Sequence, residues 1–157
     1  MVASPEATLT AVIRGTNRPS ASEWSRVLAG LPLFAGVGKR QLRKIAELAQ
    51  VREFSPGDVV VQTGDEPDGF YLILGGRAKV VGRPRAKTLK TGDYFGEMAL
   101  LDGEPRSATI SAVGELQTMR LPRKPFMRLL RREPSIALAL LTELAGRVRG
   151  LEKATIA

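Results

Sequence analysis

The chain of 157 residues contains no cysteine and no histidine. Without cysteine there is no disulfide framework, and without either residue the usual zinc and iron sites cannot be built. The lack of histidine also removes the usual base for a serine or cysteine nucleophile. These absences exclude most metalloenzymes and triad hydrolases, and we expect a protein that is not an enzyme and holds no metal.

Long apolar runs are missing as well. No stretch approaches the ~20 residues that a membrane-spanning helix needs, and the first residues lack the basic region and apolar core of a secretory signal. We therefore expect a cytoplasmic protein with no membrane partner.

Acidic residues are few compared with basic ones, 16 against 24, which gives a net charge of +8. This excess favours an anionic partner. The charge alone does not decide between a nucleic acid, a membrane surface and a phosphate compound.

The length of the chain indicates one domain with short additions. Residues 1–22, rich in small polar residues, are predicted to form a flexible arm, so that the domain spans residues 23–157. Helical spacing begins at Trp24 with Val27 and Leu28, and it returns after the bend GLPLFAGV, where Leu42 and Ile45 mark a second helix.

After Val51 the pattern changes to short β-type runs separated by Gly, Pro and Asp, which predicts a small antiparallel sandwich or barrel. These runs are REF, VVVQ, FYLIL, AKVV, KTLK, ATISA and QTMRL. The basic hairpin VVGRPRAKTLKTGD, with Arg83, Arg85, Lys87 and Lys90, is interpreted as a solvated charged turn, with a surface for an anionic partner as the alternative. The turns around Asp58–Asp65 and Gly75–Gly76 are interpreted as backbone requirements.

Two helices are predicted to close the chain. The first lies in PRKPFMRLLRREP, and the longer second one opens at Pro134. In it Leu141, Leu144, Val148 and Leu151 alternate in steps of three and four, which is typical of a short coiled-coil seam. This seam either packs on its own domain or joins two copies in a homodimer.

The segment FGEMALLDGEPRSAT, residues 95–109, combines groups suited to a phosphate-bearing ligand. A turn at Gly96 followed by one helical turn directs unpaired backbone N–H groups towards an anion. Glu97 can accept a hydrogen bond from a ribose hydroxyl. Arg106 lies at the start of the predicted strand RSATISA, and its guanidinium can donate a bidentate pair of hydrogen bonds to a phosphate. These groups together predict a nucleotide site.

This segment resembles the phosphate-binding cassette of cyclic-nucleotide-binding domains, and the resemblance extends over residues 24–152. It implies an α+β fold, an antiparallel β jelly-roll barrel flanked by N-terminal helices and two C-terminal helices. It also implies a regulatory sensor of cAMP, or of cGMP, in which ligand binding repositions the C-terminal helices. No cofactor other than that ligand is implied.

The resemblance also assigns roles to residues of this chain. Glu97 is expected to hold the ribose 2′-hydroxyl, Arg106 the cyclic phosphate and Ser107 to add a hydroxyl, with the backbone of Gly96 and of Met98–Ala99 nearby. The last helix closes over the base in this family, which makes Arg147, Val148 and Leu151 the expected lid.

Several alternatives remain open. A degenerate domain would bind no ligand and act through its surface on a protein, although Gly96, Glu97 and Arg106 argue against this. The basic stretch 120–132 lacks the interleaved aromatic residues of a nucleic-acid groove. Transcriptional relatives carry a DNA-binding domain after the last helix, and we expect none before Ala157. The effector that responds to the sensor is not identified by the sequence.

Overall fold

The computed structural model describes residues 19–81 and 87–156, without the side chains of 154–156. Residues 1–18 of the predicted arm lie outside this part, as do Arg83 and Arg85 of the basic hairpin. The first described helix, α2 (Ala21–Ala29), begins three residues before Trp24, because Ser20 and Glu23 form a reciprocal capping box. Ala21 and Ser22, which the sequence assigned to the arm, therefore form the first turn of α2.

Two short helical elements follow α2. They are the 3₁₀ helix η1 (Pro32–Phe34) and the helix α3 (Lys39–Ala46), whose residues Leu42 and Ile45 are buried. The bend GLPLFAGV predicted from the sequence contains η1.

The strands form two antiparallel sheets of four strands each, with the orders β1-β8-β3-β6 and β2-β7-β4-β5. The first sheet contains β1 (Gln50–Phe54), β3 (Gly69–Gly75), β6 (Tyr94–Phe95) and β8 (Leu116–Pro122). The second contains β2 (Val59–Val61), β4 (Ala78–Val81), β5 (Lys87–Leu89) and β7 (Thr109–Ala112). The antiparallel, jelly-roll-like α+β fold predicted from the resemblance is thus confirmed, although the two sheets do not close into a continuous barrel.

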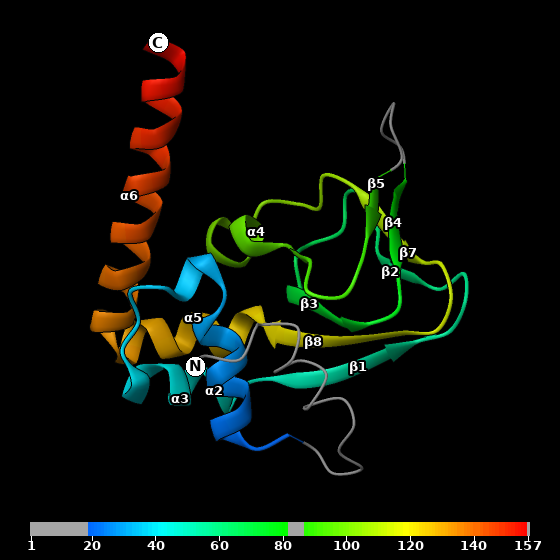
Figure 1. Ribbon diagram of the computed structural model, residues 1–157, viewed down its shortest axis with the longest axis horizontal. Helices are drawn as coiled ribbons and strands as arrows, with labels where there is room; N and C mark the ends of the chain where they lie inside the picture. The colour runs from blue at the N-terminus through cyan, green and yellow to red at the C-terminus, as the bar shows by residue number, and fades with distance from the viewer. Residues whose placement is uncertain (1–18, 82–86, 157) are drawn as a thin grey trace, which may run out of the picture.

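Strand β3 is buried on both faces and separates two hydrophobic cores. Its residues Phe70, Leu72 and Leu74 pack with the helices, and the alternating residues Tyr71 and Ile73 pack towards the second sheet. In Figure 1 the helices lie beside one end of the paired sheets.

The remaining helices are α4 (Glu97–Asp102), α5 (Arg123–Arg132) and α6 (Pro134–Ile156). Helix α6 packs against η1 and α5 near its start and then projects away from the domain, in orange and red in Figure 1. Ile136 and Leu140 anchor it in the core, whereas Leu138 and Leu141 are exposed. No helix in the described part of the chain is long and apolar enough to cross a membrane.

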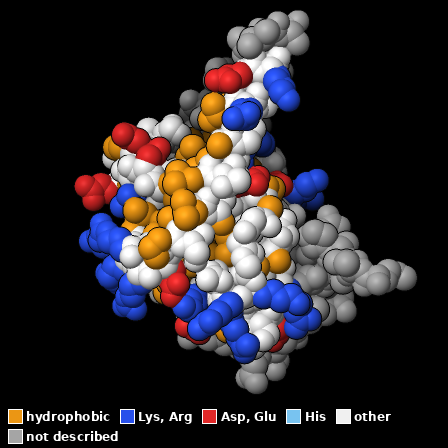
Figure 2. Space-filling view, turned by 90° about the vertical axis from the view of Figure 1, so that its left-hand side faces the viewer, with side chains coloured by type: hydrophobic (Ala, Val, Ile, Leu, Met, Phe, Trp, Pro, Cys, Tyr) orange, Lys and Arg blue, Asp and Glu red, His pale blue; other side chains and the backbone are white. Residues whose placement is uncertain are grey.

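The predicted seam of α6 is divided between two environments. Leu144 packs against the helical core, while Leu141, Val148 and Leu151 are exposed. Figure 2, which faces the α6 side of the molecule, shows hydrophobic side chains along this helix. A homodimer formed through α6 stays a prediction.

One further prediction needs correction. Arg106 does not begin a strand, since pairing of β7 with β4 starts at Thr109, and Arg106 lies in the preceding loop.

Candidate functional site

A cavity of about 470 Å³ opens beside α4, between the loop that carries Arg106 and the second sheet. Every residue predicted to contact the ligand lines it, namely Gly96, Glu97, Met98, Ala99, Arg106 and Ser107. The fold therefore brings the two halves of FGEMALLDGEPRSAT to one site. Ligand binding by these residues remains a prediction.

Arg106 is the most deeply buried charged residue of the site, with 6% of its surface exposed. Its Nη2 donates hydrogen bonds to Asp68 Oδ1 at 2.8 Å and to the carbonyl oxygen of Gly69 at 2.6 Å. The guanidinium also lies over the Tyr71 ring, 5.9 Å from its centroid, and Tyr71 in turn stacks on Phe95. These contacts fix the guanidinium from one side.

One donor of the Arg106 guanidinium is unpaired. Its Nε is buried and has no hydrogen-bond partner among the described residues. A buried donor without an acceptor is costly, so this atom is suited to an anion that enters the cavity.

Gly96 allows the guanidinium to lie where it does. Its φ is 83°, in the left-handed region, and a Cβ atom there would lie 2.5 Å from Arg106 Nη1. Gly96 is also the N-cap of α4, and its carbonyl oxygen accepts the first intrahelical bond, from Leu100 N–H at 2.9 Å. The backbone N–H groups of Glu97, Met98 and Ala99 precede that bond and have no acceptor within the helix.

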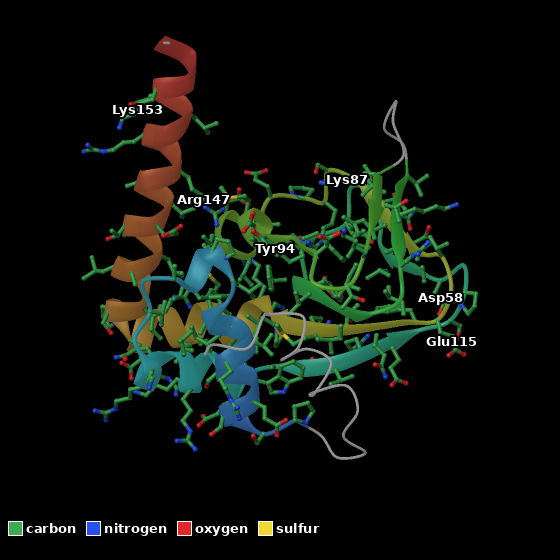
Figure 3. The ribbon with its side chains drawn as sticks, viewed as in Figure 1. Asp58, Lys87, Tyr94, Glu115, Arg147 and Lys153 are labelled. Atoms are coloured by element: carbon green, nitrogen blue, oxygen red, sulfur yellow. The ribbon has the colours of Figure 1, made fainter. Side chains whose placement is uncertain are left out.

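Glu97 carries the complementary unpaired atom, a hydrogen-bond acceptor. Its Oε2 is buried and accepts no hydrogen bond from the described residues, although Arg147 Nη1 lies 3.3 Å away at ion-pair distance. Figure 3 shows Arg147 extending from α6 towards α4. Glu97 thus joins the site to α6.

The predicted lid residues differ in position. Arg147 pairs with Glu97, but Val148 and Leu151 are 54% and 69% exposed and do not line the cavity. Among these three, Arg147 joins α6 to the site through its ion pair with Glu97.

Asp68 is a functional residue that sequence reasoning missed. It accepts hydrogen bonds from Arg106, from Tyr71 Oη at 2.7 Å and from Arg120 Nη1 at 2.9 Å. Burial raises the pKa of Asp68, but the hydrogen bonds from Tyr71 and Arg106 and the charge of Arg106 lower it by more, so it lies below its usual value. Asp68 is therefore a carboxylate that positions Arg106.

The two tyrosines of the site stay protonated at neutral pH. Burial and the hydrogen bond to Asp68 raise the pKa of Tyr71 to about 12. Burial, followed by the nearby charge of Glu97, also raises the pKa of Tyr94, and Arg147 partly opposes this. Tyr71 consequently acts as a hydrogen-bond donor to Asp68.

Arg123, at the start of α5, holds the opposite end of α4. Its Nε donates to the carbonyl oxygen of Ala99 at 3.3 Å, and its guanidinium lies where a side chain at Gly103 would have to be. Helix α4 is thus in contact with both C-terminal helices. No group of three or more acidic residues in the described ranges is arranged to hold a metal ion.

Comparison with known proteins agrees with this geometry. Residues 51–133 match the model of the cyclic nucleotide-binding domain family, and the chain belongs to that family. It is 37% identical over 138 residues to the cAMP-dependent protein kinase regulatory subunit of Emericella nidulans, an alignment that covers 80% of this chain and 33% of the relative. The chain spans at most about a third of the length of the curated relatives that it matches.

Solved structures give the same result. The N-terminal domain of a transcriptional regulator from Streptomyces coelicolor has a TM-score of 0.71 and 29% identity, covering 83% of this chain and 95% of that one. The regulatory domain of Toxoplasma gondii PKA, solved with cAMP, has a TM-score of 0.61 and 29% identity, covering 81% and 50%. These similar proteins are regulators and regulatory subunits rather than catalytic chains.

Proposed function

We propose that the domain binds a cyclic nucleotide, with cAMP as the first candidate, and that binding changes the position of α6. The observation that carries the proposal is the pair of orphaned atoms in one cavity, the donor Arg106 Nε and the acceptor Glu97 Oε2. A ligand that satisfies both must present an acceptor, best an anionic oxygen, and a donor such as a hydroxyl group. The cyclic phosphate and the ribose 2′-hydroxyl of a cyclic nucleotide meet both requirements.

In this proposal the phosphate lies against Arg106, with Ser107 and the backbone around Gly96 and Met98–Ala99 beside it. The ribose hydroxyl donates to Glu97. With a net contribution of about 1.5–3 kcal/mol for each hydrogen bond to a charged group, about three to six of them supply the roughly 8 kcal/mol that micromolar affinity needs.

The proposed output depends on Glu97, which faces both the ligand site and α6. A hydroxyl that donates to its Oε2 changes the acceptor that Arg147 approaches, so the ligand and α6 become linked through one carboxylate. The ligand shifts α6 only by the difference between its affinities for the two positions of the helix. Regulation of an effector protein, as the names of the relatives suggest, is part of the proposal, and a cytoplasmic location is proposed with it.

Calorimetric titration with cAMP, cGMP and 5′-AMP tests the ligand assignment. We expect saturable binding of a cyclic nucleotide and none of 5′-AMP. Arg106→Lys keeps the charge but removes the bidentate donor pair of the guanidinium. It should weaken binding by about 100-fold or more, because two charge-assisted hydrogen bonds are lost. Arg40→Lys, at an exposed position of α3, is the matched control for an arginine-to-lysine exchange.

Circular dichroism and a thermal melt must show that each variant is folded. If the folded wild-type protein binds none of the three nucleotides, the domain is a non-binding module that works through its surface. If Arg106→Lys binds as tightly as the wild type, Arg106 is not the phosphate ligand.

A further inference from the structure

Another cavity lies outside the candidate site, in a groove between α3 and α5, two helices that pack against each other near the start of α6. Its volume is about 380 Å³, which is enough for a few side chains of a bound segment. The apolar part of its lining is Leu48, Pro125 and Leu129, and the basic part is Lys44, Arg128 and Arg132. The groove therefore combines an apolar floor with positively charged walls.

Most of the basic side chains on these two helices are unpaired within the ranges that the structure describes. Lys44 forms an ion pair with Glu133, so this cation and anion of the lining neutralise each other. Arg128 and Arg132 are exposed, and their side chains have neither an ion pair nor a hydrogen bond with the described residues. The same is true of Lys39, Arg40, Arg43, Lys124 and Arg131. Glu47, at the end of α3, is the acidic residue of the lining that has no ion pair there.

Figure 2 shows Lys and Arg side chains gathered below the exposed hydrophobic side chains of α6. Helix stability accounts for only part of this charge, because basic residues are favourable in the last turn of a helix and unfavourable in the first. Helix α3 nevertheless begins with Lys39 and Arg40, and Lys124 lies in the first turn of α5. Neither first turn contains an acidic residue. Charges placed against the helix dipole indicate a function other than stability.

The form of this surface favours a protein segment over a membrane or a nucleic acid. A peripheral membrane site needs protruding apolar side chains, but none of the exposed large hydrophobic residues in the described ranges lies in α3 or α5. Single-stranded nucleic acid stacks on exposed aromatic rings, whereas Phe126, the aromatic residue of α5, is fully buried. Leu48 and Leu129 are partly buried and line the groove, where the side chains of a peptide can reach them.

We propose that the groove between α3 and α5 binds an acidic segment of a partner protein that carries aliphatic side chains among its carboxylates. The carboxylates pair with Arg128, Arg132 and the neighbouring cations, and the aliphatic side chains contact Leu48 and Leu129. Charge complementarity guides such an encounter, and burial of the aliphatic side chains adds affinity. This interaction goes beyond the proposed function, since it uses no residue that lines the cavity beside α4.

Fluorescence anisotropy with two labelled peptides tests the proposal. The first peptide consists of Glu and Asp with two leucines four residues apart, and the second has serine in place of both leucines. We expect saturable binding of the first peptide and about tenfold weaker binding of the second, because the leucines lose their contact with the apolar floor. The titrations contain no nucleotide, so their result is independent of the ligand of the other cavity.

A pair of double variants tests the position of the site. Arg128→Gln with Arg132→Gln removes both free cations of the lining and should weaken binding of the leucine peptide by about tenfold. Arg52→Gln with Arg77→Gln is the matched control, because both arginines are exposed outside α3 and α5 and have no ion pair with the described residues. It removes the same charge and should leave the affinity unchanged. Circular dichroism must show that both variants are folded.

Four results would overturn the proposal. Absence of binding of the leucine peptide to the folded wild type would mean that the groove takes no acidic segment. Equal affinity for the two peptides would mean that the apolar floor is not used. Equal weakening in the two double variants would make the net charge of the protein, and not the groove, responsible. Stronger binding of phosphatidylserine vesicles or of a short DNA duplex, lost in Arg128→Gln with Arg132→Gln, would assign the surface to a membrane or to a nucleic acid.

Discussion

Gly96 combines a positive φ with a position in which any side chain would collide with Arg106. Alanine there should cost about 1–2 kcal/mol for the left-handed backbone and should also displace the guanidinium. Gly64 has nearly the same φ, 89°, but nothing lies within 4 Å of the point that a Cβ atom would occupy. Gly64→Ala therefore isolates the backbone cost.

We expect both alanine variants to lower the free energy of unfolding in urea, but only Gly96→Ala to weaken binding of a cyclic nucleotide, by about tenfold or more. The tenfold figure corresponds to the loss of one hydrogen bond to a charged group. Equal affinity in the two variants would show that the contact of Gly96 with Arg106 has no part in binding.

Asp68 leads to a prediction about pH. Its pKa is lowered in the folded protein, so its stabilising contribution is complete above the unfolded value of about 3.9 and is lost as the pH falls through the native pKa. Asp68→Asn should cost about 1–2 kcal/mol at pH 7, a value reduced for the half-exposed carboxylate.

The difference in unfolding free energy between wild type and Asp68→Asn should therefore shrink below about pH 4. Urea unfolding at a series of pH values from 7 to 3 measures it. Asp65→Asn, an exposed change in the same turn, is the control. A difference that stays constant down to pH 3 would contradict the proposed role of the Asp68 charge.

Asp68 also shows why part of the site escapes prediction. Its partners Arg106 and Arg120 lie 38 and 52 residues away, and no local pattern connects them. The cassette from Gly96 to Ser107 is predictable because its groups lie close together in the sequence.

Most helices and strands are predictable from local pattern. Trp24, Val27 and Leu28 recur at helical spacing and are buried in α2, and the run FYLIL becomes the central part of β3. The loop that carries Arg106 is harder, because its residues have β-type character and only pairing with β4 decides where β7 begins.

Helix α6 is held to α4 by the pair of Arg147 and Glu97, whose side chains are 30% and 23% exposed. A partly exposed ion pair contributes up to about 1 kcal/mol, so Arg147→Ala should speed amide exchange in α6 beyond Leu144 by up to about fivefold. Hydrogen exchange with mass spectrometry measures this effect.

Arg149→Ala is the control, because Arg149 is exposed in the same helix and has no ion pair with the described residues. Similar exchange in both variants and the wild type would show that α6 is held by its core contacts alone. In that case the proposed link between ligand and helix would have to run through α5 and Arg123.

At the scale of the whole molecule, the fold brings segments that are distant in the sequence together around one cavity. The loop with Arg106, helix α4 and the strands of the second sheet surround it, so a ligand bound there stabilises the folded state as a unit. At 100 times its Kd a ligand adds about 2.7 kcal/mol, which corresponds to a rise in Tm of about 5–10 °C for a chain of this size.

Differential scanning fluorimetry with cAMP, cGMP and 5′-AMP measures that rise. We expect it for a cyclic nucleotide and not for 5′-AMP, and we expect it to be absent at the same concentration in Arg106→Lys. A similar rise with 5′-AMP would indicate a general phosphate effect on a protein with a net charge of +8.

The way α6 leaves the domain has a mechanical consequence. Leu144 still packs against the helical core, and at 1.5 Å per residue Arg147 lies ~5 Å and Lys153 ~14 Å further along the axis. A stiff rod pivoting at Leu144 and pushed at Arg147 acts as a lever with a ratio of about three. A sideways step of ~1 Å at the carboxylate of Glu97 would thus become ~3 Å at the far end, where Figure 1 shows the helix standing clear of the domain.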